Sequence, residues 1–448
     1  MNGFITDKQT LEDLNLVARF KKDSVINIYD RTRTRRGRQI MESMFRSPLS
    51  SAAQINDRAA SFAWFSGRGC PEFNIEEDKL ESLEYYLGNS PITNPAALLM
   101  RLCTSRIKAI FLSDPSYGKL IECLKDVCAI VLELFSLIDR LCLPGDNGEC
   151  PFEKEKGRFC SVFDADLRAN MEKVVNAEKI SFGTVVKLDI VFRSKLREAL
   201  VEMQELIAYL DVRIAVAHVA DELGLCYAQA SDGGNPEVHM RNVRHPALAR
   251  AVGNHINMDS ESNLFFLTGV NMAGKSTFMK SVAIALYLAQ MGFPVPAESV
   301  SFVPVEGLFT SINVPDNIVK GYSHFYAEVL RVKGIAQRVG EGKKLFVIFD
   351  ELFKGTNVKD AFDATLSVVT AFAKHRNCLF VVSTHIVEVG ASLSETCNSV
   401  QFKCLPSEMD GDRLIYRYKL QDGISTDRHG MTIIRNEHIL DIIKQGIQ

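Results

Sequence analysis

The sequence predicts a chain of two parts, a helical first half followed by an α/β second half with a parallel sheet. Two observations predict this. In the first half, apolar residues recur every three or four positions, which is the spacing of amphipathic helices. In the second half, short apolar runs at 264–268, 345–349 and 379–383 alternate with helical stretches, which is typical of buried parallel strands with crossover helices.

The length and composition agree with a globular protein of more than one domain. The chain has 448 residues, of which 46% are hydrophobic and 24% charged. Lys and Arg number 52 against 55 Asp and Glu, which leaves a net charge of −3. The overall charge therefore does not indicate a nucleic-acid partner, and such a contact would need a local basic patch.

The cysteines and the N-terminus predict a cytoplasmic protein without a membrane partner. The 11 cysteines are scattered, with no CxxC pair and no zinc-type spacing, as expected for reduced thiols. Charged residues stand in the first 14 positions, where a signal peptide needs an apolar core. The longest uncharged run, 281–297, contains two prolines, which disfavours a membrane span.

Within the first half, helical spacing runs from Thr10 to about Leu143, and the breaker-rich stretch 144–151 predicts a hinge or a helix connection. Helical spacing resumes near Asp164, and a long helix is predicted near 193–223. Apolar and charged residues alternate over 186–192, so the pattern leaves a strand and a helix open there. The turn-rich stretch 230–236 ends the helical half. We therefore predict domains at 1–231 and 232–448.

The first chemical motif is GVNMAGKS at 269–276, which matches GxxxxGK[ST] between an apolar run and an amphipathic helix. In such a loop, backbone N–H groups at a helix N-terminus surround phosphate oxygens. Lys275 would hold the β- and γ-phosphates and Ser276 a Mg²⁺ ion; the alternative is a plain glycine turn. The predicted nucleotide-binding residues of this stretch are Gly269, Val270, Asn271, Met272, Ala273, Gly274, Lys275, Ser276 and Thr277.

Two further candidates follow the other apolar runs. Asp350 and Glu351 end the run 345–349, where Asp350 would join the Mg²⁺ shell and Glu351 would polarise the water that attacks the γ-phosphate. His385 follows the run 379–383 and would reach the γ-phosphate at the same sheet edge. The alternatives are a strand that ends in solvated acids and a structural histidine.

These stretches together resemble one protein family. TGVNMAGKSTF, LFVIFDELFKGTN and VVSTHIVEV are similar to the ATPase domain of the MutS family, DNA mismatch-repair proteins related to ABC-type ATPases. The stretches 244–246 and 418–430 agree with it, and 10–14 and 30–49 look like the family's helical core and lever domain. The resemblance therefore implies a helical core/lever domain followed by a P-loop, ABC-like ATPase domain.

The resemblance also implies roles and partners. Ser323 lies in a segment like the family's GxSxFxxE, whose serine acts across a dimer on the partner's γ-phosphate. Ala251 stands where an aromatic residue would stack on adenine, and Tyr418 would supply the stacking from the other side. The implied cofactors are ATP and Mg²⁺. The implied partners are DNA and a second subunit, either the same chain or another MutS-like protein.

Several departures from the family qualify this expectation. Met1 stands where the family's core domain begins, so we expect no mismatch-reading or connector domain, and 144–160 is too short for a DNA-clasping domain of normal size. Val270 and Ala273 replace the usual Pro and Gly of the loop. Phe353 and Lys354 stand where Gly and Arg are usual, and the C-terminal dimer element is short.

The basic run at 31–38 contains five arginines, which are suited to phosphate contacts; a solvated helix start is the alternative. The leading hypothesis is an ATP-hydrolysing dimer that switches its helical arms on DNA, in mismatch repair or recombination. A second hypothesis is a nucleotide-gated scaffold for a protein or ribonucleoprotein partner. A third, a transporter-type ATPase subunit, is disfavoured by the absent LSGGQ segment and the large helical half.

Overall fold

The computed structural model describes residues 3–18, 20–66, 72–88, 94–142, 150–312, 324–410, 413–425, 438–439 and 442–443. The chain forms two compact units. The first, which we call the α/β unit, comprises Met1–Tyr29, Met44–Ala60 and Glu222–Gln448, and the second, the helical unit, comprises Asp30–Ser43 and Ser61–Asp221. This division differs from a single cut after residue 231, because two N-terminal segments pack with the second half of the chain.

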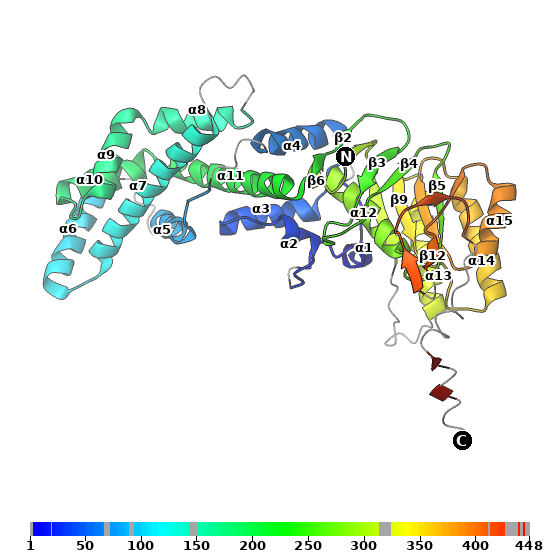
Figure 1. Cartoon of the computed structure of the whole chain (residues 1–448). Helices are drawn as coiled ribbons and strands as arrows, with labels where there is room; N and C mark the ends of the chain where they lie inside the picture. Colours follow the sequence, from blue (N-terminus) through cyan, green and yellow to red (C-terminus); the bar gives the residue numbers. More distant parts are fainter. Residues whose placement is uncertain are drawn as a thin grey trace. The chain divides into compact units, whose positions relative to one another are not determined.

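The helical unit is all-helical over its described residues (Figure 1). A continuous apolar core joins its long helices, with Leu124, Val131 and Ile138 from α7 and Leu200 and Ile207 from α11. The helices are α5 (Glu77–Gly88), α6 (Pro95–Leu112), α7 (Ser116–Leu141), α8 (Glu153–Val162), α9 (Ala165–Asn176), α10 (Phe182–Ser194) and most of α11 (Arg197–Leu223), with most of α3 (Arg35–Arg46) and the end of α4 (Ala52–Phe65).

The structure confirms the predicted helical character and the long helix near 193–223. It also decides the ambiguous stretch 186–192, which lies inside α10. The buried apolar residues of α10 are Val185, Leu188 and Phe192, at helical spacing, so the alternation in the sequence does not correspond to a buried strand face. The predicted connection at 144–151 lies largely outside the described residues.

The main sheet of the α/β unit has six strands in the order β14 (Gln421–Asp422), β11 (Val400–Cys404), β5 (Leu264–Thr268), β10 (Leu379–Ser383), β9 (Leu345–Phe349) and β8 (Gly307–Ser311). The three apolar runs predicted as strands are β5, β9 and β10, with the predicted bounds. They pair in parallel, as predicted, and only β14 at one edge is antiparallel to its neighbour. All residues of β5, β9 and β10 are buried, which explains why they have no alternating pattern.

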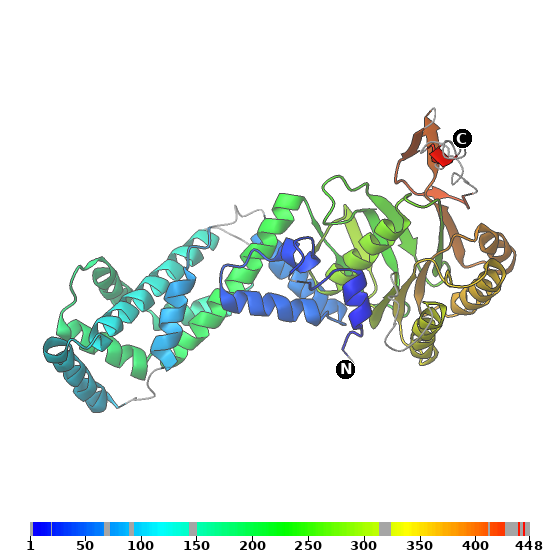
Figure 2. The same cartoon turned by 90° about the horizontal axis from the view of Figure 1, so that it is seen from below.

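Helices cover both faces of this sheet. Helices α13 (His324–Gly340), α14 (Val358–Ala373) and α15 (Val387–Thr396) share one apolar core with the strands, and Figure 2 shows them, from yellow to brown, along one side of the sheet. Helix α12 (Lys275–Gln290) packs on the opposite face, where the rings of Phe265 and Phe278 lie 5.8 Å apart. This α/β arrangement places the ends of β5, β9 and β10 at one edge.

Smaller strands complete the α/β unit. A four-stranded sheet has the order β2 (Gln229–Ala230), β7 (Ser299–Phe302), β3 (Val238–Val243) and β4 (Asn254–Met258). Two further pairs are β1 (Cys226–Tyr227) with β6 (Pro294–Val295), and β12 (Ser407–Asp410) with β13 (Arg413–Tyr416). No helix of the described residues is long and apolar enough to cross a membrane.

The N-terminal segments explain the discontinuous α/β unit. Helix α2 (Val25–Tyr29) ends in Tyr29, whose ring contacts Phe45 and Phe293, and the rings of Phe45 and Phe293 lie edge to face at 5.3 Å. The Tyr287 hydroxyl donates to the backbone oxygen of Phe45. These contacts bury the end of α3 against α12 and the turn after it.

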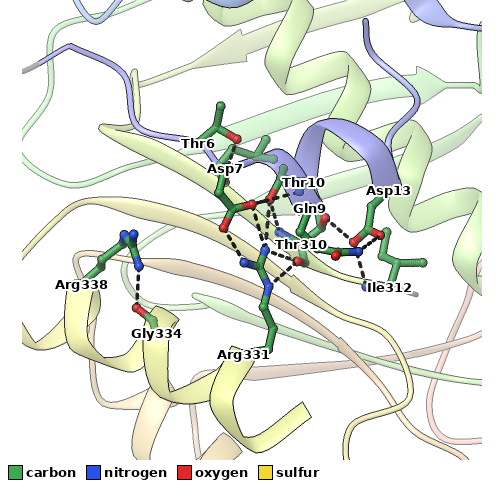
Figure 3. A network of polar contacts seen from close by, with 11 residues as sticks. Thr6, Asp7, Gln9, Thr10, Asp13, Thr310, Ile312, Arg331, Gly334 and Arg338 are labelled. Atoms are coloured by element: carbon green, nitrogen blue, oxygen red, sulfur yellow. Dashed lines mark hydrogen bonds and ion pairs between the residues drawn. The ribbon is translucent and has the colours of Figure 1, made fainter. Parts of the chain in front are cut away.

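The first described residues cover the outer edge of the main sheet (Figure 3). Ile5 forms a parallel bridge to Gly307, and α1 (Lys8–Asp13) packs against β8. On α13, the Arg331 guanidinium forms an ion pair with Asp7 and donates to the Thr310 carbonyl oxygen. An uncovered edge strand would expose unpaired backbone groups, so this segment protects the sheet at β8.

Candidate active site

The loop between β5 and α12 is shaped by residues with positive φ: Gly269 at 141°, Met272 at 70° and Gly274 at 95°. A Cβ at Gly269 would lie 2.7 Å from the Leu405 carbonyl oxygen, and one at Gly274 would lie 3.0 Å from the Tyr418 ring. Both the backbone conformation and the close neighbours therefore require glycine at 269 and 274. The loop ends at the N-terminus of α12, where backbone N–H groups favour an anion.

Lys275 is the first residue of α12, and only 5% of its surface is exposed. Its Nζ donates to the carbonyl oxygens of Gly269, at 2.7 Å, and Val270, at 3.2 Å, so the loop encircles the ammonium group. Burial lowers the pKa of Lys275, while the nearby Glu351 and Asp350 carboxylates oppose this shift. The site therefore holds a partly desolvated cation beside the phosphate-type loop.

Asp350 follows β9, and its carboxylate accepts hydrogen bonds from two hydroxyl groups. The Ser276 Oγ donates to Asp350 Oδ2, and the Ser383 Oγ donates to Asp350 Oδ1 at 2.5 Å. A carboxylate next to a hydroxyl is an oxygen donor set that Mg²⁺ accepts, usually together with waters and substrate phosphates. The described residues contain no cluster of three His, Cys, Asp or Glu side chains that could hold a metal alone. The pair Ser276 and Asp350 therefore fits a metal that arrives with a phosphate ligand.

Glu351 is held by a histidine and a lysine side chain. Its Oε1 lies 2.7 Å from His385 Nε2, and its Oε2 lies 3.3 Å from Lys354 Nζ. The hydrogen bond from His385 is the main cause that lowers the pKa of Glu351 to about 2, against the effect of burial. The backbone of Glu351 has a φ of 57°, and its N–H donates to the Ser383 carbonyl oxygen at 3.1 Å. At neutral pH, Glu351 is therefore an oriented carboxylate anion.

A cavity of about 420 Å³ lies over the loop. One wall consists of loop and α12 residues with Glu351, and the other comes from the segment 243–254 with Leu405 and Tyr418. Of the predicted site residues, those that line the cavity are Val270, Asn271, Met272, Gly274, Lys275, Ser276, Thr277, Glu351 and Tyr418. Gly269, Ala273, Asp350 and His385 do not line it; His385 and Asp350 instead contact lining residues.

Tyr418 and Ala251 face the same cavity. The backbone around Tyr418 is fixed by Asn254, whose Nδ2 donates to the Tyr418 carbonyl oxygen and whose Oδ1 accepts from the Leu420 N–H, each at 2.9 Å. The Tyr418 ring is therefore positioned beside Gly274 at the cavity wall, while Ala251 contributes no ring. This arrangement leaves one aromatic surface available to a planar base.

Sequence reasoning overlooked two residues and could not place a third. Ser383 directly ends the strand next to β9, so its contact with Asp350 follows from the parallel pairing and was available as a signal. Asn254 carries no motif, and nothing in the sequence indicates its contact with a segment more than 160 residues away. Ser323 lies outside the described residues, between β8 and α13, so its predicted role stays a prediction.

The basic run at 31–38 has structural partners as well as exposed arginines. Asp211 of α11 accepts from the backbone N–H groups of Arg33 and Thr34 and from the Thr34 hydroxyl, just before α3 begins. Arg36 pairs with Glu205, while Arg31 remains exposed at the surface. The run therefore begins a helix held by a buried carboxylate, and a contact with DNA stays a prediction.

Comparisons with known proteins find one family over this part of the chain. The family described as MutS domain V matches residues 265–446, which include the loop, Asp350, Glu351 and His385. A DNA mismatch repair protein MutS from Pseudothermotoga lettingae is 29% identical over 238 residues, or 52% of this chain and 29% of that protein. MutS from Staphylococcus epidermidis is 28% identical over 285 residues, 60% of this chain and 31% of that protein.

A eukaryotic protein shows a similar identity over a similar share of this chain. DNA mismatch repair protein spellchecker 1 from Drosophila melanogaster is 28% identical over 250 residues, which are 54% of this chain and 27% of that protein. The chain thus spans about three tenths of the length of these curated relatives.

Proposed function

Because this chain belongs to the MutS family, we propose that its α/β unit binds ATP with Mg²⁺ and hydrolyses it to ADP and phosphate. The observation that carries the proposal is the convergence of four side chains at one edge of the sheet: Lys275, Ser276 and Glu351 line a cavity of about 420 Å³, and Asp350 accepts a hydrogen bond from Ser276. A phosphate-shaped loop, a buried cation and an oriented carboxylate are the parts that phosphoryl transfer needs.

In this proposal, the triphosphate lies along the loop from Gly269 to Gly274, and its oxygens accept from the loop N–H groups. The Lys275 ammonium, which donates to the carbonyl oxygens of Gly269 and Val270, would turn to the β- and γ-phosphate oxygens. Ser276 and Asp350 would hold Mg²⁺, which supplies charge neutralisation on the phosphates when bound. The adenine would stack on Tyr418, with Ala251 on the opposite side.

The Glu351 carboxylate would accept a hydrogen bond from the attacking water and direct its oxygen toward the γ-phosphorus. A new bond forms between that oxygen and phosphorus, the bond from phosphorus to the β–γ bridging oxygen breaks, and ADP leaves with the electron pair. The proton released by the water passes to the phosphate product or to solvent. His385 would act as a positioning residue, since it holds Glu351 at 2.7 Å.

The proposal has a direct test with matched variants. Steady-state ATP turnover should fall at least 100-fold in Glu351→Gln, while ATP binding persists, because the amide keeps the shape but not the charge. Lys275→Ala should weaken ATP binding itself. Glu155→Gln, an exposed change on α8, is the control and should leave both quantities unchanged. Unaltered turnover in Glu351→Gln would remove Glu351 from the mechanism, and absent nucleotide binding with Mg²⁺ would remove the whole proposal.

We further propose that two subunits complete each site, with Ser323 of one subunit acting on the γ-phosphate held by the other. Mixing inactive Ser323→Ala and Lys275→Ala subunits tests this, because mixed dimers regain one intact site only if Ser323 acts across the dimer. Activity that is not recovered in a mixture shown to contain mixed dimers would contradict the shared site.

The proposed output is a nucleotide-dependent change in binding to DNA, as expected for a mismatch-repair or recombination protein. The test is binding to perfect, mismatched and branched duplexes with and without ATP, over a series of salt concentrations. Phosphate contacts predict an affinity that falls steeply with salt. Absent or salt-insensitive binding would instead favour the scaffold hypothesis, in which a protein or ribonucleoprotein is the partner.

A further inference from the structure

Helix α6 of the helical unit presents large apolar side chains to solvent. Met100 is 74% exposed, Ile107 56%, Ile110 66% and Phe111 79%. No element of the described residues covers them, and Figure 1 shows α6, in cyan, beside α7 at the end of this unit. Single exposed apolar residues are ordinary on protein surfaces, but several of them on one helix indicate an interaction site.

The exposed residues form a second face, opposite the one that packs. Helix α6 contacts α7 and α10, and its buried residues are Leu98 and Leu102. At about 100° per residue, Met100 and Ile107 lie on the opposite side of the helix from this buried pair. The exposed apolar face covers about 120° of the circumference, as wide as the contact face of an ordinary amphipathic helix. Helix α6 therefore has one apolar face that packs on α7 and α10 and a second apolar face that no described helix covers.

The spacing of this face indicates the kind of neighbour. Ala96, Met100, Cys103, Ile107 and Ile110 follow one another at intervals of four, three, four and three residues. This is the repeat of a coiled-coil seam, in which side chains of one helix fit between those of another. A lipid surface needs apolar area but no such register. The seam therefore favours a helix as the partner.

The charges of α6 decide between partner helices. The helix carries Arg101, Arg106 and Lys108 and no acidic residue. Arg106, whose guanidinium lies 4.5 Å from the centre of the Phe182 ring, directly flanks the seam, and Arg101 and Lys108 lie further around the helix on the other side. A second copy packed on this seam would bring together two helices that each carry three cations and no acidic residue. Opposite charges at the flanks of a seam favour pairing, so the complementary partner is acidic.

We propose that this seam binds an acidic amphipathic helix of a partner protein. The site is separate from the cavity of the α/β unit, and the inference does not depend on ATP hydrolysis. Two heptads form a small interface, which fits a reversible partner with a dissociation constant of about 10–100 µM.

The probe is a designed, fluorescently labelled 21-residue helix with Leu at its seam positions and Glu at the flanking positions. Its matched control carries Lys at the same flanking positions. Fluorescence anisotropy with the full chain measures binding. We expect the acidic peptide to bind and the basic peptide to bind at least tenfold more weakly. The affinity of the acidic peptide should fall as salt is raised, because its charge pairs are exposed.

Variants of exposed residues locate the site without disturbing the core. Ile107→Ser with Ile110→Ser should weaken acidic-peptide binding at least tenfold, and Arg101→Glu with Lys108→Glu should do the same. Val201→Ser and Lys173→Glu, exposed changes on other helices of this unit, are the controls and should have no effect. Circular dichroism of each variant verifies that the helical unit remains folded.

Three results would overturn the proposal. One is equal or absent binding of the acidic and basic peptides. Another is binding to vesicles of phosphatidylserine and phosphatidylcholine that the Ile107 and Ile110 changes abolish, which would make a lipid surface the partner. The third is a change of oligomeric state with these same variants in analytical ultracentrifugation, which would make a second copy the partner.

Discussion

The substitution Asp13→Ala should destabilise the α/β unit far more than its place near the N-terminus suggests. Asp13 is the last residue of α1 and is 6% exposed. Its side chain contacts the C-terminal end of β8 and the residue that follows this strand. Its Oδ2 accepts from the Thr310 hydroxyl at 2.7 Å and from the Ile312 N–H at 3.0 Å (Figure 3). Removing the carboxylate leaves two buried donors without this acceptor.

The expected magnitude follows from these contacts. Hydrogen bonds to a charged group contribute about 1.5–3 kcal/mol each, so losing both should cost about 3–6 kcal/mol of unfolding free energy. The third bond, from Gln9 Nε2 to Asp13 Oδ1, is only part-buried and should add little. Asp13→Asn keeps one acceptor oxygen and should cost about half as much.

Urea unfolding monitored by circular dichroism measures the change, and hydrogen exchange should show lost protection in peptides that cover α1 and β8. Asp363→Ala, an exposed substitution on α14, is the control and should change stability by less than about 0.5 kcal/mol. Thr310→Val combined with Asp13→Ala should cost less than the two single changes added together, because both remove the same bond. A cost below about 1 kcal/mol for Asp13→Ala, or strict additivity, would refute this account of the contact.

Three further outcomes concern the candidate site. Gly274→Ala should raise the dissociation constant for ATP at least tenfold, because its φ is 95° and its Cβ would press on the Tyr418 ring; Gly234→Ala, with open space around it, is the control. Tyr418→Ala should weaken adenine-nucleotide binding in equilibrium titration, and Tyr418→Phe should preserve it; equal binding in both would exclude stacking. The pKa of Glu351 is lowered from its ordinary 4.5 to about 2, so its stabilising contribution is present above pH 4.5 and is lost as the pH falls toward 2. Acid unfolding of Glu351→Gln should therefore be less steep over this range, and an unchanged acid profile would show that the pair with His385 contributes nothing.

Much of the α/β unit could be predicted because its signals are local. The continuous apolar runs of β5, β9 and β10 reflect burial on both faces, so their bounds and parallel pairing were predicted correctly. The loop at 269–274 was equally predictable, since left-handed backbone angles require glycine wherever the rest of the chain lies. The helical half was predicted by its spacing, apart from α10, where an alternating pattern coincides with a helix.

The sequence by itself determined the kinds of secondary structure, the glycine-lysine loop and the acidic strand end, because each depends on neighbours within a few residues. Only the tertiary structure decided that the first 29 residues pack with the second half, that Asp13 contacts Ile312, and that Asn254 binds the backbone around Tyr418. It alone showed that the apolar residues of α6 face solvent, since helical spacing predicts an apolar face but not what covers it. These contacts depend on how elements far apart in the sequence pack together. The pattern of neighbouring residues within one element does not contain this information.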